Sequence, residues 1–159
     1  MILIIIDILA VTVIVLLFSS AVKPKKKVKV EDKAQRVIID KDEAATINNL
    51  VKENIGIGTL DGRLIPLIKK GEKVPCKRSL TFTTSEDNQE HITLGFYRGT
   101  NELTEKCTFL GQYRITKFLP MDAGQPIVQV TIEVDNKHIY VYVKDLKSKC
   151  KLSIKRLTK

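Results

Sequence analysis

The 159-residue sequence has few of the residues from which metal sites and disulfide frameworks are built. It contains two histidines, three cysteines and no Cys-x-x-Cys pair. Neither His91 nor His138 has a partner at metal-ligand spacing, so no metal or other cofactor is expected. The odd number of cysteines argues against a disulfide framework and favours reduced thiols in a cytoplasmic domain.

The common catalytic motifs are also missing. Gly56-x-Gly58 is not followed by a third glycine or by Gly-Lys-Ser/Thr, so the sequence does not support a phosphate-binding loop. There is no His-Glu-x-x-His motif and no hydrolase-type order of serine, histidine and aspartate. The sequence therefore predicts that the protein is not an enzyme.

Positive charge is concentrated towards the two ends of a chain whose formal net charge is +9. Residues 23–36 carry a net charge of +5 and residues 144–159 a net charge of +6, whereas the long middle stretch is almost neutral. In the C-terminal stretch lysines alternate with apolar residues, which is typical of an edge strand whose lysines block aggregation. It lacks the interleaved aromatic residues of a nucleic-acid surface, so no nucleic-acid partner is expected.

One long apolar run lies at the N-terminus. Residues 2–22 contain a single charged residue, Asp7, and as a helix they would measure about 31 Å, close to the thickness of a bilayer core. We therefore expect residues 1–22 to form a transmembrane helix. The alternative is a cleaved signal peptide, for which Ser19 and Ala21 offer a small-x-small site. That alternative lacks a basic leading region, and the run is longer than the usual signal core.

A lysine cluster follows this run directly and consists of Lys23, Lys25, Lys26, Lys27 and Lys29. Positive flanks of a membrane span stay in the cytoplasm, so the cluster predicts a single-pass protein with a cytoplasmic C-terminal domain. It would also attract an anionic lipid surface. If the apolar run is instead a cleaved signal, the domain would be exported.

The rest of the chain divides into a basic juxtamembrane tether, residues 23–54, and a domain at residues 55–159. A loose helical stripe predicts a short helix over residues 41–52. From Ile55 onward apolar residues alternate with polar ones, which is the pattern of half-buried antiparallel strands, and Asp61-Gly62 is a hairpin-turn signal. The expected fold is mainly β, an antiparallel sandwich of about eight strands. These strands are predicted at residues 55–60, 63–68, 78–84, 91–97, 109–115, 127–134, 138–144 and 149–156.

The stretch from Ile55 to Ile154 resembles the substrate-binding β-sandwich domain of the heat shock protein 70 chaperone family. The resemblance is carried by several runs of residues that match the family's pattern almost without gaps over about 100 residues. These runs include Val74-Pro75, Phe82, Thr84, Glu86-Asp87-Asn88-Gln89, Leu110-Gly111, Gly124-Gln125-Pro126, Val130-Thr131-Ile132-Glu133-Val134-Asp135 and Val143-Lys144-Asp145. No part of the chain resembles the family's ATPase domain or its helical lid.

The resemblance implies a groove that binds an extended peptide through main-chain hydrogen bonds and one apolar side chain. It places Ile57, Phe82, Ile92 and Leu94 around a central pocket, with Leu60 and Ser85 arched over the peptide. It places Thr59, Thr83, Gln89, His91 and Thr93 along the peptide backbone. From the residue pattern alone, the four pocket residues are better explained as plain sandwich core, and only the resemblance favours the groove.

Two functions remain open at this point. The first is a membrane-anchored, ATP-independent, chaperone-like module that holds extended or unfolded polypeptide segments. The second is a structural subunit of a membrane protein complex, built on a sandwich whose groove no longer binds peptide. An open apolar slot at the central pocket favours the first function, and a slot filled by a loop or a neighbouring subunit favours the second.

Overall fold

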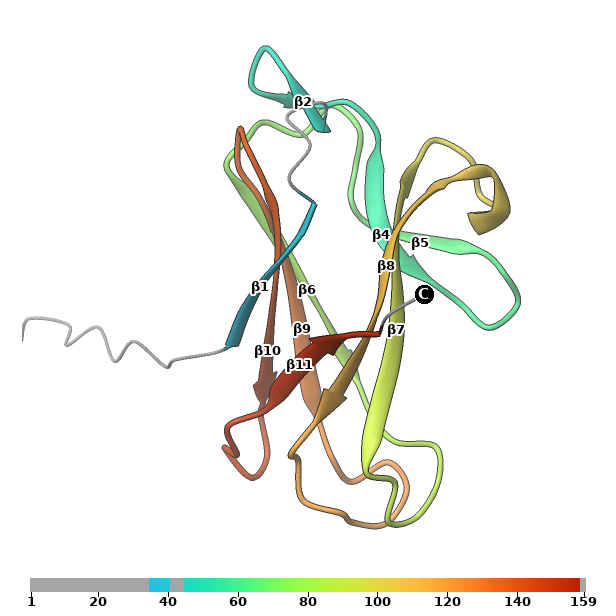
Figure 1. Cartoon of the computed structure of the whole chain (residues 1–159), viewed down its shortest axis with the longest axis vertical. Coiled ribbons are helices and arrows are strands. Elements are labelled where there is room, and N and C mark those ends of the chain that lie inside the picture. Colours follow the sequence, from blue (N-terminus) through green and yellow to red (C-terminus); the bar gives the residue numbers. More distant parts are fainter. Residues whose placement is uncertain (1–34, 41–44, 158–159) are drawn as a thin grey trace, which may run out of the picture. The chain divides into compact units, whose positions relative to one another are not determined.

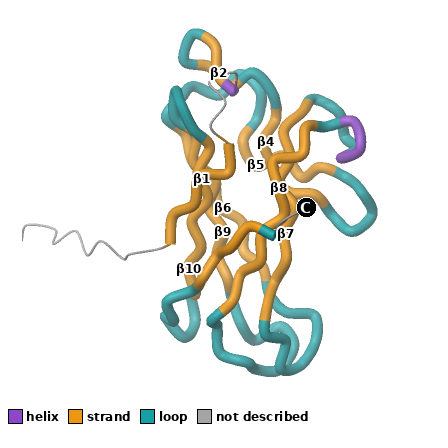
Figure 2. The backbone as a smooth tube through the Cα atoms, in the orientation of Figure 1, coloured by secondary structure: helices purple, strands orange, loops and turns teal. Residues whose placement is uncertain are grey.

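A computed structural model describes residues 35–40 and 45–157 of the chain, which belong to one compact unit, residues 33–159. Two antiparallel β-sheets make up most of it and face each other across a shared hydrophobic core (Figure 1; Figure 2). The mainly β, antiparallel fold expected from the sequence is confirmed.

The two sheets have four and five strands, and a separate two-stranded hairpin stands beside them. In hydrogen-bonding order the four-stranded sheet contains β1 (Gln35–Asp40), β10 (Ile139–Asp145), β9 (Val128–Val134) and β6 (Cys76–Phe82). The five-stranded sheet contains β11 (Ser153–Arg156), β8 (Thr108–Thr116), β7 (His91–Gly99), β4 (Asn54–Gly58) and β5 (Leu64–Ile68). The hairpin contains β2 (Thr46–Ile47) and β3 (Leu50–Val51), and a 3₁₀ turn, η2 (Thr104–Lys106), precedes β8.

The core is formed by the inward-facing side chains, which occupy every second position along the strands. In β9, Val128, Val130, Ile132 and Val134 are fully buried while the residues between them are half-buried. β7 faces them from the other sheet with its own alternating apolar side chains. In the five-stranded sheet Phe96 and Tyr113 meet edge to face, with ring centroids 5.6 Å apart.

Each of the eight predicted strands is present, with ends that shift by a few residues. The C-terminal strand is the most shortened, since it begins at Ser153 rather than at residue 149. It is an edge strand of the five-stranded sheet, as the alternation of lysine and apolar residues indicated. The Asp61-Gly62 hairpin is also confirmed, because it joins β4 to β5 and Gly62 has a φ of +79°, which suits glycine.

The helix predicted over residues 41–52 is wrong where the structure describes it. Residues 46–51 form the β2–β3 hairpin, in which Thr46 pairs with Val51 and Ile47 pairs with Leu50. Asn48 and Asn49 have φ values of +50° and +61°, the conformation of a two-residue hairpin turn, and asparagine tolerates it better than most residues. This turn signal outweighs the loose helical stripe.

The sandwich also takes in part of the predicted tether. β1 pairs with β10 from Gln35↔Val143 to Asp40↔Ile139 and so forms an edge of the four-stranded sheet. The Gln35 side chain reaches the other sheet, where its Nε2 donates to the Ile154 carbonyl and its Oε1 accepts from the Ile154 N–H at 3.0 Å. Arg36 stacks over the Tyr140 ring at 3.5 Å.

A largely buried ion pair fixes the other end of β1. Arg98 of β7 lies 2.9 Å from the Asp40 carboxylate, and both side chains are only 12% exposed. The same guanidinium lies 3.1 Å from Glu53, just before β4. Arg98 therefore connects β1 of one sheet with two segments of the other, and loss of either partner would leave a poorly solvated charge.

The predicted membrane span and the lysine cluster of residues 23–29 lie outside the described residues. Within residues 35–40 and 45–157 there is no helix with the length and hydropathy needed to cross a bilayer. The division of the chain at residues 22 and 54 stays a prediction.

The loop after β10 is organised by a buried carboxylate. Asp145 is 3% exposed and accepts hydrogen bonds from the N–H groups of Lys147 and Ser148, both at 2.9 Å, and from the Ser148 hydroxyl. Burial alone would raise the pKa of Asp145, but these hydrogen bonds outweigh it and hold the pKa below its usual value. The ionised side chain thus closes the turn that leads to β11.

We predict that Asp145 makes the fold sensitive to acid. Because its folded pKa is depressed, its stabilisation is present above the unfolded pKa of about 3.9 and is lost as the pH falls through the folded pKa. Asp145→Asn should lower the free energy of unfolding at neutral pH by about 1–2 kcal/mol and weaken its dependence on acid pH. Urea titrations across the acid range measure both effects.

Asp122→Asn removes the same charge from an exposed loop residue and is the matched control. It should change stability by about 0.5 kcal/mol or less. Equal acid sensitivity in wild type and Asp145→Asn would contradict the assignment.

Candidate functional site

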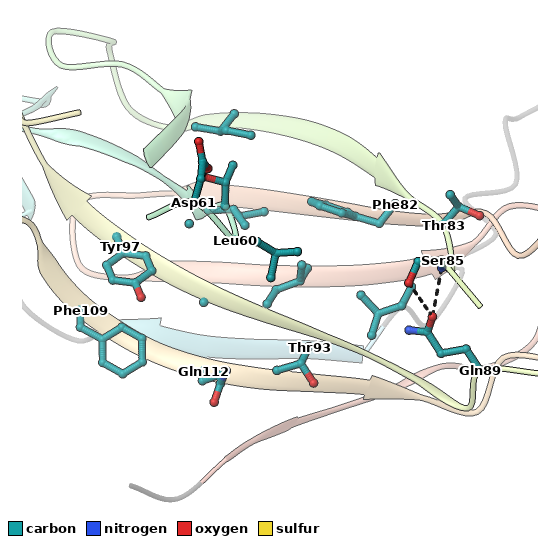
Figure 3. Close-up of a pocket in the computed structure, with 17 residues that line it drawn as sticks. Leu60, Asp61, Phe82, Thr83, Ser85, Gln89, Thr93, Tyr97, Phe109 and Gln112 are labelled. Carbon is teal, nitrogen blue, oxygen red and sulfur yellow. Dashed lines mark hydrogen bonds between the residues drawn. The ribbon is translucent and has the colours of Figure 1, made fainter. Parts of the chain in front are cut away.

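An open groove lies beside two loops of the sandwich. One loop, residues 59–63, joins β4 to β5, and the other, residues 83–90, joins β6 to β7. The groove encloses about 850 Å³ and is lined by side chains from β4, β5, β6, β7 and β8 as well as from the loops (Figure 3). This volume is in the range of binding sites for small molecules or short peptide segments.

The floor of the groove is apolar and belongs to the core. Ile57, Ile92 and Leu94 are 2%, 6% and 7% exposed, and Phe82 at the end of β6 is half-buried. Because β4 and β7 are hydrogen-bonded neighbours, Ile57 comes close to the apolar residues of β7. The four residues predicted to surround a central pocket are therefore brought together, and they serve the core at the same time.

The roof of the groove is formed by exposed side chains of the two loops. Leu60 stands fully exposed at the tip of the first loop, and Ser85 is exposed on the second (Figure 3). Among the described residues the groove is open, and Leu60 is an exposed apolar side chain among those that line it.

Hydrogen bonds hold the first loop in shape. The Thr59 hydroxyl donates to the Asp61 carboxylate and accepts from the Arg63 N–H at 3.0 Å, while the Thr59 N–H donates to the Arg63 carbonyl at 2.8 Å. The Thr59 hydroxyl, and to a smaller extent Arg63, hold the pKa of Asp61 below its usual value. Asp61 is the one charged side chain among the described residues that line the groove.

The second loop is braced by one amide side chain. Gln89 Oε1 accepts a hydrogen bond from the Ser85 N–H at 3.0 Å, and Gln89 Nε2 donates to the His91 carbonyl at 2.6 Å (Figure 3). Gln89 thus connects the tip of the loop with the first residue of β7. These two hydrogen bonds restrain the position of Ser85 relative to β7.

Ten of the eleven residues predicted to bind peptide line this groove. They are Ile57, Thr59, Leu60, Phe82, Thr83, Ser85, Gln89, Ile92, Thr93 and Leu94. The exception is His91, whose exposed side chain lines a separate hollow with Arg114 and Lys117. The role of these residues in binding peptide stays a prediction.

The groove also includes residues that the sequence argument did not name. They are Gly58, Asp61, Ile65, Gly95, Tyr97, Phe109 and Gln112. The signal for two of them was present in the alternation of β7, because Gly95 and Tyr97 follow Thr93 on the non-core positions of the strand. Phe109 comes from β8 and pairs with Tyr97, which only the register of the two strands reveals.

Two sheets over one core, with an apolar groove open between two braced loops, define a β-sandwich binding domain. Residues 23–156 match the family model described as Hsp70 protein, so the chain belongs to the Hsp70 family. A curated relative, heat shock cognate 70 kDa protein 3 of Dictyostelium discoideum, is 26% identical over 126 residues. The aligned part covers 76% of this chain and 20% of the relative, so the chain spans about a fifth of that protein's length.

Family membership corrects one expectation. The absence of catalytic motifs predicted that the protein is not an enzyme, but members of the Hsp70 family are ATPases. The missing phosphate-loop motif was therefore not sufficient ground for that exclusion. The expected chaperone resemblance, by contrast, is confirmed at the level of the family.

We predict that the Gln89 brace controls the second loop. Gln89→Leu should remove both hydrogen bonds while keeping a side chain of similar size, lowering the free energy of unfolding by about 1 kcal/mol. The Ser85 amide should then exchange its hydrogen faster, as nuclear magnetic resonance can measure residue by residue.

Gln112→Leu is the control, because the Gln112 side chain lines the same groove without a hydrogen bond among the described residues. It should leave the exchange of Ser85 unchanged. An unaltered Ser85 exchange rate in Gln89→Leu would show that the loop is held by other contacts.

Proposed function

We propose that this domain is the peptide-binding sandwich of a membrane-anchored, chaperone-like protein that holds extended or unfolded polypeptide segments. The observation that carries the proposal is the open groove, with its apolar floor of Ile57, Ile92 and Leu94 and the exposed Leu60 above it. Proteins of the Hsp70 family bind unfolded polypeptides, and this groove offers the surface such a segment needs.

The groove combines the two kinds of contact by which proteins capture extended peptides. Thr83 and Thr93 line it beside the apolar slot, and their hydroxyls can pair with the peptide main chain, whereas the Thr59 hydroxyl is already bonded within its own loop. One apolar side chain of the peptide would enter the slot and be removed from water. All of these contacts lie within the sandwich, so we propose that capture itself proceeds without ATP.

The membrane part of the proposal depends on the sequence. A span over residues 2–22 would anchor the protein, and the five lysines that follow it would keep the sandwich on the cytoplasmic side, beside an anionic lipid surface. The alternative function, a structural subunit of a membrane complex, requires that a neighbour fill the groove. The described residues do not fill the groove themselves, so this alternative needs a second protein.

We predict that the full chain in detergent micelles binds a fluorescein-labelled heptapeptide with a central leucine. Because the described residues leave the groove open to solvent, the dissociation constant of this chain should be micromolar at best, about −8 kcal/mol. Leu60→Ala should weaken binding at least about fivefold by a faster off-rate, because it removes the roof contact. It should leave the melting temperature unchanged, since Leu60 is fully exposed.

The matched control is Leu119→Ala, which removes an exposed leucine outside the groove and should leave binding unchanged. Addition of ATP should not alter the affinity of the groove. If fluorescence anisotropy shows no saturable binding, or the same curve for wild type and Leu60→Ala, the peptide groove is not functional and the structural-subunit function replaces this proposal.

We predict further that the full chain stays with the membrane fraction during alkaline carbonate extraction. Val13→Asp with Leu16→Asp should release it, because each charge at the centre of a span costs about 2.5–3.5 kcal/mol. Protease added to the cytoplasmic side should digest the sandwich. A shortened, exported protein would instead favour the cleaved signal peptide.

A further inference from the structure

A basic surface lies along one edge of the five-stranded sheet, on the far side of the sheet from β5. Arg114 of β8 is the cross-strand partner of Lys155 of β11, so both side chains lie on the same, outer face of the sheet. Lys117 directly follows β8, and all three side chains are exposed. We call Arg114, Lys117 and Lys155 the basic edge.

The charge of the basic edge is not compensated within the part of the chain that the structure describes. None of its three side chains forms an ion pair or a hydrogen bond with a described residue. Like charges directly opposite each other on neighbouring strands destabilise a sheet. A lysine such as Lys155 is common on an edge strand, where it blocks aggregation, but Arg114 lies on an inner strand. The pair therefore favours an anionic partner outside the domain.

A hollow of about 390 Å³ adjoins the basic edge. It is lined by two of the basic residues and five others, namely Arg114, Lys117, Glu90, His91, Thr116, Phe118 and Pro120. Glu90 contributes one carboxylate, so the cationic side chains outnumber it. The Arg114 guanidinium can donate two parallel hydrogen bonds to a phosphate group, and the Thr116 hydroxyl can donate another. The hollow thus offers the donors that a phosphate-type anion needs.

An exposed leucine beside these charges favours a bilayer over a dissolved anion. Leu119 is 50% exposed and lies between Phe118 and Pro120, which both line the hollow. Lys117 has a φ of +71°, which is uncommon for a residue other than glycine, so the chain turns where β8 ends and this loop begins. Surfaces that bind anionic membranes combine basic side chains with apolar ones that enter the headgroup region. A dissolved phosphate would use the charges but not the leucine.

The chain enters the sandwich beside the basic edge. Gln35, the first residue of β1, accepts a hydrogen bond from the Ile154 N–H at 3.0 Å, and Lys155 is the next residue of β11 (Figure 1). The lysine cluster of residues 23–29 ends six residues before Gln35, and six residues reach at most about 20 Å. If that cluster lies at an anionic membrane, as proposed, the basic edge is within reach of the same surface.

We propose that the basic edge docks the sandwich onto anionic phospholipid headgroups, with Arg114 and Lys155 bound to phosphate groups and Leu119 entering the interface. The inference rests on the proposed membrane anchor and adds a second contact with the same bilayer. Each basic residue near such a surface strengthens binding about fivefold, and the anchor supplies a high effective concentration. Thr93 of β7 continues the row of Arg114 and Lys155 and lines the groove, so docking would hold the groove beside the headgroups.

Chemical acetylation of lysines tests the inference on the full chain reconstituted into lipid nanodiscs. One set of discs contains phosphatidylcholine alone, and the other contains about one third phosphatidylglycerol, which supplies the anionic surface. An uncharged acetylating reagent and mass spectrometry give the reaction rate of each lysine. Lys117 and Lys155 should react at least about threefold more slowly in the anionic discs, and high salt should remove the difference. Lys77 is exposed on β6 of the other sheet and should react equally in both.

Arg114→Gln with Lys155→Gln should weaken docking about 25-fold, because two charges worth about fivefold each are removed. Lys117 should then react in anionic discs as fast as in neutral ones. The melting temperature should stay the same or rise, since the change also removes a repulsive cross-strand pair, so unfolding would not explain the loss. Lys69→Gln with Lys70→Gln is the matched control. It removes the same charge just beyond β5, at the opposite edge of the sheet, and should leave Lys117 protected.

Docking on lipid is wrong if Lys117 of the wild type reacts at the same rate in both kinds of disc, or if the double variant stays protected. Inorganic phosphate added to the neutral discs identifies a dissolved ligand: equal protection of Lys117 there would assign the hollow to a free anion and overturn docking. Protection by polyglutamate but not by anionic discs would assign the surface to an acidic protein instead. All of these results leave the anchor and the peptide groove intact, whereas a chain that does not enter the discs removes the proposed anchor and this inference with it.

Discussion

The structure depends on the burial of one face of β7 against the opposite sheet. β7 lies inside the five-stranded sheet, where it is hydrogen-bonded to β4 on one side and to β8 on the other. Its inward residues Ile92, Leu94 and Phe96 meet the fully buried valines and isoleucine of β9 in one core. Since Ile92 and Leu94 also form the groove floor, the shape of the slot is set by the packing of the core. A larger residue at either position would close the slot and strain the core together, at a cost of about 1–3 kcal/mol.

The period-two pattern was sufficient to predict the strands of the sandwich, because alternation is the direct consequence of burying one face of a strand. It was not sufficient for β1, because the short apolar run Val37-Ile38-Ile39 does not alternate and follows a highly charged stretch. β1 is held by contacts from far along the chain, including Gln35 with Ile154 and Asp40 with Arg98. No local pattern shows such partners. The incorrect helix over residues 41–52 has a different origin, since there the local Asn48-Asn49 turn outweighs a weak apolar stripe.

The candidate site could be predicted only in part, and the limit there differs from the one that applied to β1. Composition and spacing do not distinguish a groove floor from a core, and the residues of the floor are in fact buried like core residues. The resemblance to the Hsp70 family supplied that distinction. It did not supply Tyr97 and Phe109, whose proximity follows from the β7–β8 register and from the irregularity between Phe96 and Tyr97. His91 is not among the groove-lining residues: its carbonyl accepts a hydrogen bond from Gln89, and its side chain lines a separate hollow.

The size of the expected binding energy explains why peptide binding to this groove should be weak. Burying one leucine side chain contributes about 1.5–3 kcal/mol, and each main-chain hydrogen bond adds a net contribution of about 1 kcal/mol. Association costs at least about 4 kcal/mol in lost freedom, while micromolar affinity requires about −8 kcal/mol. One slot and a few hydrogen bonds therefore give weak binding, and the exposed loops offer only Leu60 and Ser85 as a roof.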